Sequence, residues 1–242
     1  MNVLIACEES QTVCKAFRAL GHRAFSCDLQ DCSVGRPEWH IKADAITLIN
    51  GNCDFMTADT HTHTQRGEWD LLIAHPPCTF LTTAANQCHS LACYSKDEIA
   101  ERTLKRIAAM AFFMKFVTAK CRRICIENPT GVMNTCYRKP DQTIEPYYFA
   151  DSWDDEENYC TKKTGLWLFG LPPLQFSFIL PNPIYDAPTW QNGKRKNWTE
   201  AHSGGVTRSK TFPGIARAMA EQWAGENKEK EAYERSAYSF PG

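Results

Sequence analysis

The sequence predicts an α/β protein with a doubly wound, mostly parallel sheet of Rossmann-like type. Short, continuously apolar runs such as 2–7 and 69–75 are typical of strands that are buried on both faces of a parallel sheet. Segments with apolar residues at helical spacing, such as 10–20 and 97–119, alternate with these runs. The repeated order of strand, helix and strand therefore favours an open, doubly wound sheet.

Each element follows from its local pattern. We expect strands at 2–7, 23–29, 39–44, 69–75, 123–128 and 164–170, the one at 39–44 having the weakest pattern. We expect helices at 10–20, 97–119 and 209–224. Ser10 is the expected N-cap of the first helix, and Gly21 lies just past its end. Pro213 falls in the first turn of the last helix, where proline is tolerated.

The remaining segments have little periodicity. The stretch 130–207 is rich in Pro, Asn, Asp, Gly and Tyr, and only its run at 164–170 has a strand pattern. The sequence THTHTQ, which contains His61 and His63, is interpreted as a polar, turn-like stretch with a structural or surface role. We expect one main domain from 1–170 and 208–225, an irregular region at 171–207, and a charged, disordered tail at 226–242.

The composition excludes several classes of protein. The chain of 242 residues has 27 basic and 28 acidic side chains, so any basic nucleic-acid footprint must be local. No window approaches 18 apolar residues, and the start MNVLIACEES lacks the features of a signal peptide. We therefore expect a cytoplasmic protein without a membrane partner. The 12 cysteines include no CxxC pair, so we expect buried thiols and no metal site.

The ends of the predicted strands carry an unusual set of side chains. In an open parallel sheet, ligands bind at the carboxyl ends of the strands. Acids and a thiol are expected to share this edge, in the segments Ala6-Cys7-Glu8-Glu9-Ser10, Asp28, Asp44, His75-Pro76-Pro77-Cys78 and Glu127-Asn128-Pro129.

These residue types favour group transfer. Cys78, held by a rigid Pro-Pro loop, is a candidate nucleophile because a thiolate is strongly nucleophilic. Glu127 is expected to be partly buried, with a raised pKa that lets it donate a proton or a hydrogen bond. Asp28 suits ribose hydroxyls and Asp44 an adenine amino group, which together indicate an adenosine-containing cofactor. His75 is interpreted as a structural hydrogen-bonding residue, with tuning of the thiol as the alternative.

The paired triplets carry a family resemblance. Pro-Pro-Cys after one apolar strand, followed about 50 residues later by Glu-Asn-Pro after another, resembles the DNA cytosine-5 methyltransferase family. The resemblance covers roughly 1–130 and 160–224. It implies a class I S-adenosylmethionine-dependent methyltransferase fold, S-adenosylmethionine as cofactor and DNA as partner. It also implies that Cys78 attacks C6 of cytosine, that Glu127 binds N3 and the exocyclic amine, and that C5 then takes the methyl group.

The resemblance also implies a role for each matching residue. Catalysis is assigned to Cys78 and Glu127. Substrate binding is assigned to Pro77, Thr79, Asn128, Lys163 and Arg208. Cofactor binding is assigned to Ala6, Cys7, Glu8, Ser10, Asp28, Asp44 and Pro76.

The chain differs from the family pattern in three respects. Its first loop contains no glycine, and Lys162 and Lys163 stand where the family has an arginine-rich motif. The region available for target recognition is short, and it includes the basic, aromatic stretch WQNGKRKNW. We therefore expect a compact member that acts on DNA. The alternatives are C5 methylation of a cytosine nucleotide, single-stranded DNA or RNA, and a non-catalytic homologue that binds S-adenosylmethionine or nucleic acid.

Overall fold

A computed structural model of the chain describes residues 1–33, 35–83, 86, 90–176, 180–181, 183 and 211–225. The predicted substrate-binding residue Arg208, most of the predicted recognition region at 171–207 and the tail at 226–242 lie outside these residues. Among the described helices, none is both long and apolar enough to cross a membrane.

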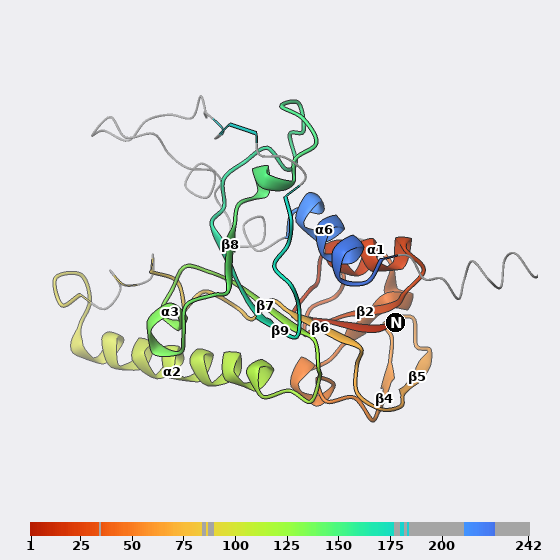
Figure 1. The fold of residues 1–242 in the computed structure, drawn as a ribbon. Helices are drawn as coiled ribbons and strands as arrows, with labels where there is room; N and C mark the ends of the chain where they lie inside the picture. Colours follow the sequence, from red (N-terminus) through yellow and green to blue (C-terminus); the bar gives the residue numbers. More distant parts are fainter. Residues whose placement is uncertain are drawn as a thin grey trace, which may run out of the picture.

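Seven strands form the central sheet, in the order β3-β2-β1-β6-β7-β9-β8 (Figure 1). Their bounds are β1 Asn2–Ala6, β2 Arg23–Asp28, β3 His40–Lys42, β6 Leu71–Ala74, β7 Ile124–Pro129, β8 Gln142–Ile144 and β9 Thr164–Phe169. The first five strands of this order pair in parallel, whereas β9 runs antiparallel between β7 and β8. The predicted α/β class with a mostly parallel sheet is confirmed, and the sheet is compatible with a Rossmann-like fold.

Helices cover both faces of the sheet. Helices α1 (Thr12–Ala19) and α6 (Pro213–Trp223) pack on one face, and α2 (Lys96–Val117) lies on the other (Figure 1). Successive side chains of a strand point to opposite faces, so the apolar runs supply both cores. Val3 belongs to the core under α1 and α6, and its neighbour Leu4 belongs to the core that contains Phe113 and Phe116 of α2.

The predicted long helix agrees with α2. Ser95 and Glu98 form a capping box, in which the Ser95 hydroxyl accepts the Glu98 amide and the Glu98 carboxylate accepts the Ser95 amide. These reciprocal bonds fix where α2 begins. The last predicted helix is α6, and Pro213 occupies its first turn as expected.

The expected cap of α1 is wrong. The N-cap position is Gln11, which has a left-handed backbone (φ 57°) and no capping side chain. Instead, the buried carboxylate of Glu8 accepts the backbone amides of Val13 at 2.6 Å and Cys14 at 3.2 Å. A carboxylate at a helix N-terminus also interacts favourably with the helix dipole. Glu8 therefore caps α1 from outside the helix, a contact that local spacing does not reveal.

The interpretation of THTHTQ as a turn is wrong. Strand β5 (Thr62–Gln65) pairs with β4 (Cys53–Met56) in an antiparallel hairpin outside the main sheet. His63 stacks on Phe55 with ring centroids 5.4 Å apart, and His61 Nδ1 lies 2.7 Å from an oxygen of Asp59. The hairpin was missed because its period-2 pattern alternates between polar residues and histidine. The ring contact of His63 and the 75% exposure of His61 agree with structural or surface roles, which stay a prediction.

The segment after β7 contains more regular structure than the sequence predicted. Besides β9 it forms α3 (Met133–Cys136), β8 and the 3-10 helix η4 (Pro146–Phe149). Two further 3-10 helices, η1 (Pro37–Trp39) and η2 (Ala45–Thr47), flank β3.

The acidic segment that follows η4 is a folded loop. Asp155 accepts the amides of Asp151 and Asn158, and Asn158 Oδ1 accepts the backbone amide of Gly214 at 2.7 Å. These bonds hold the loop against the N-terminus of α6.

Candidate active site

The sheet changes its winding direction between β1 and β6. From β1 the chain proceeds to β2 and β3 on one side, and β6 and β7 lie on the other. Ligands of open α/β sheets bind in the crevice outside the carboxyl ends of the strands at such a point. The residues after β1 and β6 therefore flank the natural binding position of this fold. Because β9 is antiparallel, its first residue, Thr164, also lies at this edge.

Strand register brings the two predicted motifs together. Ala74 of β6 pairs with Ile126 of β7, so the next residues along these strands are His75 and Glu127. His75 Nδ1 lies 2.9 Å from Glu127 Oε2, and the two side chains are only 8% and 11% exposed. The partner of the His75 ring is therefore the carboxylate of the second motif. This contact matches the structural role expected for His75, although its partner was not foreseen.

The environment of Glu127 differs from the expected one. Burial acts to raise the pKa of Glu127, but the His75 hydrogen bond, the charge of Lys162 and a hydrogen bond with Thr164 outweigh it and lower the pKa. The expectation of a raised pKa was wrong because it considered burial without these partners. Glu127 in this structure is a carboxylate stabilised by three neighbours.

Asn128 fixes the Pro-Pro loop. Its side chain is buried, and its Nδ2 donates a 2.7 Å hydrogen bond to the carbonyl oxygen of Pro76. The predicted binding residues Asn128 and Pro76 are thus joined to each other. This bond and the fixed φ angles of Pro76 and Pro77 restrict the backbone that leads to Cys78.

A second connection lies beyond Cys78. The Cys78 carbonyl accepts the amides of Leu81 at 2.9 Å and Thr82 at 3.0 Å, which closes a tight turn around the half-buried cysteine. Thr82 then forms an isolated bridge with Gly131, and Val132 donates to the Leu81 carbonyl at 2.8 Å. The Pro-Pro-Cys loop and the segment after Glu-Asn-Pro are therefore held together at both ends.

Helix α2 supports the loop through two arginines. Arg106 Nε donates to the Phe80 carbonyl at 3.0 Å, and the Arg102 guanidinium lies over the Phe80 ring, 5.2 Å from its centroid. The predicted substrate-binding residues Pro77 and Thr79 are exposed on the same loop. The cysteine is thus flanked by accessible residues on a supported backbone.

The predicted cofactor residues Cys7, Asp28 and Asp44 lie near one another. Cys7 has a left-handed backbone (φ 60°), the conformation for which glycine is favoured and which the glycine-free loop adopts nonetheless. Burial raises the pKa of the Cys7 thiol, and the nearby charges of Asp28 and Asp44 raise it further. Each aspartate uses one oxygen to accept a backbone amide, that of Gln30 or of Ile46. Asp28 is partly exposed and Asp44 is exposed, so both carboxylates are accessible from solvent.

Three other predicted cofactor residues are already engaged within the protein. Glu8 caps α1, and burial raises its pKa despite the opposing effects of His75 and the two backbone amides. Ser10 is buried and accepts a hydrogen bond from the Thr12 hydroxyl. Ala6 is buried in β1, and its carbonyl accepts the amide of His75 at 2.9 Å. Ala6 and Glu8 shape the loop that a cofactor would approach.

The basic residue near Glu127 is Lys162 rather than Lys163. Lys162 lowers the pKa of Glu127, and its ammonium lies 5.5 Å from the centroid of the Phe212 ring. Lys163 is exposed, and its charge acts on Glu145. The sequence could have distinguished the two lysines, because side chains alternate along an extended chain. Residues 162 and 164 then share one side, and residue 163 faces the other.

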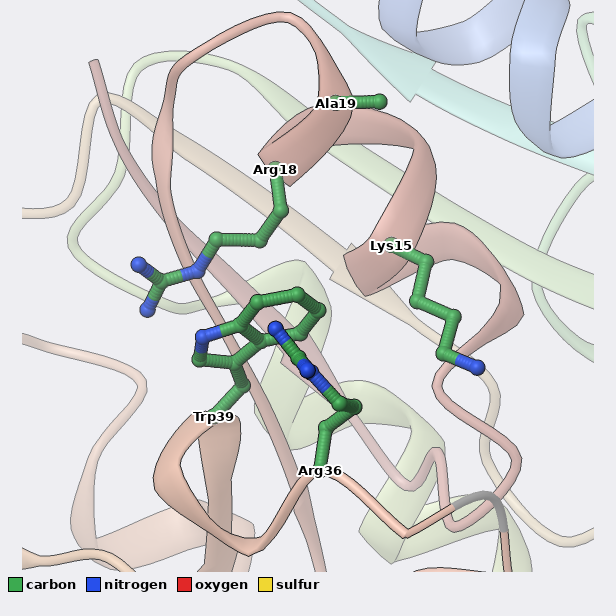
Figure 2. A pocket seen from close by; sticks show the side chains of 5 residues that line it. All are labelled: Lys15, Arg18, Ala19, Arg36 and Trp39. Carbon is green, nitrogen blue, oxygen red and sulfur yellow. The ribbon is translucent and has the colours of Figure 1, made fainter.

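A separate basic hollow of about 360 Å³ lies against the outer side of α1. Figure 2 shows its lining by Lys15, Arg18 and Ala19 of α1 and by Arg36 and Trp39. The Arg36 guanidinium stacks 4.1 Å from the Trp39 ring centroid. None of the predicted site residues lines it. Across the described part of the chain, no group of three or more His, Cys, Asp or Glu residues is arranged to hold a metal ion.

Comparison with known proteins finds no family model and no curated protein that matches this chain. The class of the protein therefore rests on its own motifs and geometry.

Proposed function

We propose that the protein transfers a methyl group from S-adenosylmethionine to C5 of cytosine in DNA, through a covalent bond between Cys78 and C6. One observation carries the proposal. The loop that ends in Cys78 and the strand end that carries Glu127 are joined by the Asn128–Pro76 bond at 2.7 Å and the His75–Glu127 bond at 2.9 Å. Cys78 and Glu127, the proposed nucleophile and the proposed acid–base group, therefore lie on connected segments at the ends of adjacent strands.

The chemistry of cytosine explains why both groups are needed. C5 of the aromatic ring is a poor nucleophile until another nucleophile adds at C6. The Cys78 thiolate would supply the electron pair for the new S–C6 bond. Glu127 in its protonated form would stabilise the ring by donating a hydrogen bond to N3 and accepting one from the exocyclic amine. When bound, S-adenosylmethionine supplies the electrophilic methyl group. A base then removes the C5 proton, and the S–C6 bond breaks to release Cys78.

The opposite side of the same edge suits the cofactor. Asp28, at the end of β2, is the position at which a carboxylate binds ribose hydroxyls in doubly wound folds. Asp44, next to it, suits an adenine amino group. The short loop at Cys7 lies between these carboxylates and the Pro-Pro-Cys loop. We therefore propose that the sheet and its helices form a class I S-adenosylmethionine-dependent methyltransferase fold.

A target base inside a duplex must leave the stack to reach such a site. We propose DNA as the substrate and a short or degenerate recognition sequence, because few residues remain for a recognition region. Free dCMP, single-stranded DNA, RNA and duplex DNA assayed side by side would identify the substrate. Transfer to duplex DNA above the other three is the expected result.

The test of the proposed reaction is Cys78→Ala, with Cys136→Ala as the matched control because Cys136 is an exposed thiol on α3. Cys78→Ala is expected to abolish formation of 5-methylcytosine while binding of S-adenosylmethionine is retained. Cys136→Ala is expected to behave as the wild type. Formation of 5-methylcytosine by Cys78→Ala would refute the covalent mechanism. Cofactor binding without methyl transfer by the wild type would favour a non-catalytic homologue.

A further inference from the structure

The His75–Glu127 pair has a feature that the proposed function does not use. The side chain of His75 is only 8% exposed, and its Nδ1 lies 2.9 Å from Glu127 Oε2. Among the described residues, its second ring nitrogen, Nε2, is buried without a hydrogen-bond partner. A buried imidazole satisfied on one side only is costly, because an unpaired polar atom loses its hydration without compensation. Such a group invites a functional explanation.

The charged surroundings of the pair are defined by four elements. Glu8, at the N-terminus of α1, interacts electrostatically with His75. Lys162, just before β9, acts on Glu127 from the other side. Cys125 on β7 is buried, and burial together with the Glu127 charge raises its pKa. Cys78 belongs to the same loop as His75. The imidazole thus interacts with two buried carboxylates, and only one of them forms a direct bond with it.

The proposed reaction makes a demand that a carboxylate alone does not meet. N3 of neutral cytosine is a hydrogen-bond acceptor, so it needs a proton donor when Cys78 adds to C6. The structure lowers the pKa of Glu127, which favours the form that has no proton to give. A proton source next to Glu127 would remove this conflict, and the bonded His75 is that neighbour.

We propose, on the basis of the proposed function, that His75 and Glu127 act as one proton-sharing pair and that His75 supplies, through Glu127, the proton that N3 takes up. In this role His75 is a positioning residue, because it reaches the substrate only through Glu127.

A cationic His75 passes its Nδ1 proton to Glu127 Oε2, which leaves a neutral imidazole and a neutral carboxyl group. The carboxyl group gives the proton to N3 while the Cys78 electron pair forms the S–C6 bond. When that bond later breaks, the N3 proton returns to Glu127. The unpartnered Nε2 assists the first transfer, because an N–H group without an acceptor is costlier on a charged ring than on a neutral one.

The pair predicts a specific pH dependence. The reactive form holds the extra proton, so activity is lost as the pH rises past the apparent pKa of the pair. An ordinary imidazole retains its proton to about pH 6.5, and an ordinary Glu carboxyl only to about pH 4.3. Removing the imidazole should therefore shift the basic limb of the profile downward by as much as about two pH units. At neutral pH this corresponds to a loss of rate of roughly ten- to a hundredfold.

The variant that tests this is His75→Gln, whose amide can still donate a hydrogen bond to Glu127 but cannot carry the extra proton. His61→Gln is the matched control, because His61 also pairs with a carboxylate through Nδ1, at 2.7 Å, but is 75% exposed on the hairpin. Two rates are measured across the range in which histidine titrates. One is methyl transfer to DNA. The other is exchange of the cytosine C5 proton with solvent, which requires addition of Cys78 but no methyl donor.

Three results separate the possibilities. A downward shift of the basic limb in His75→Gln, with unchanged KM for DNA and a wild-type profile for His61→Gln, supports the pair. An unshifted limb in His75→Gln, or an equal loss of rate at every pH, overturns the pair and leaves the proposed function intact. Absence of both reactions in the wild type at every pH overturns the proposed function, and the pair with it.

A measurement without catalysis keeps the inference testable if His75→Gln does not fold. Nitrogen NMR of the imidazole reports the environment of His75 Nδ1 in the wild type and in Glu127→Gln. The pair predicts that the Nδ1 signal of His75 changes in Glu127→Gln, because the 2.9 Å partner of that nitrogen is then an amide and no longer a carboxyl group that can exchange a proton with it. An identical Nδ1 signal in both proteins would exclude proton sharing.

Discussion

Gly131→Ala tests whether the two motif loops depend on each other. A Cβ atom at position 131 would lie 2.0 Å from the carbonyl oxygen of Leu81 and 2.8 Å from its carbonyl carbon. Both atoms belong to the backbone, so no side-chain rotation can relieve the overlap. The segment after Glu-Asn-Pro must therefore move away from the turn that follows Cys78.

The magnitude follows from the bonds that this movement breaks. Separation removes the 2.8 Å bond from Val132 to Leu81 and the 3.2 Å bond from Thr83 to Thr130. Each is worth about 1 kcal/mol, so with residual strain we expect a loss of roughly 2–3 kcal/mol of unfolding free energy. For a chain of this size, that lowers the midpoint of thermal unfolding by roughly 5–10 °C.

The assay combines thermal unfolding with methyl transfer, using Thr130→Ala as the control because the Thr130 side chain is exposed and its backbone contact is retained. Methyl transfer by Gly131→Ala should fall by more than tenfold even at a temperature where the variant is folded, because Cys78 and Glu127 are no longer held in register. A Gly131→Ala protein with the stability and activity of the wild type would refute the coupling of the loops.

Three further variants address single contacts. Lys162→Gln removes a charge that lowers the pKa of Glu127, so that pKa should rise and the basic limb of the pH–rate profile should move to higher pH, whereas Lys115→Gln on α2 should leave the profile unchanged. Asn128→Ala removes the 2.7 Å bond to the Pro-Pro loop and should cost about 1–2 kcal/mol in a denaturant titration together with most of the methyl transfer. Glu8→Ala removes the cap of α1 and should lower the unfolding free energy by about 1–2 kcal/mol. A change of no more than about 0.5 kcal/mol, as for an ordinary surface substitution, would contradict the capping role.

The sheet was predictable because its strands are buried on both faces. The apolar runs at 2–7, 69–75 and 123–128 correspond to β1, β6 and β7, and the patterns at 23–29 and 39–44 correspond to β2 and β3. The direction of each strand in the sheet was harder to predict from the sequence. The run that became β9 looks the same in either direction, so its antiparallel insertion follows from tertiary connections rather than from its own residues. The short β8 was missed because three residues carry too little pattern.

The candidate site was predictable as a set of strand ends and not as a network. The sequence indicated Cys78 and Glu127, but the register of β6 and β7 was needed to show that Glu127 bonds to His75. The expected raised pKa of Glu127 failed for the same reason, since burial can be anticipated from sequence and bonding partners cannot. Glu8 was assigned to the cofactor and is bonded to α1, because a carboxylate near a strand end can serve either a ligand or a helix N-terminus.

The most direct measurement of the proposed mechanism is mass spectrometry of the protein after reaction with S-adenosylmethionine and duplex DNA that contains 5-fluorocytosine. Fluorine at C5 blocks the proton removal that would release the enzyme, so the S–C6 bond persists. We predict a covalent protein–DNA adduct that maps to Cys78 and is absent from Cys78→Ala. A wild-type protein that forms no adduct while it converts normal cytosine to 5-methylcytosine, or an adduct on any other cysteine, would contradict the mechanism.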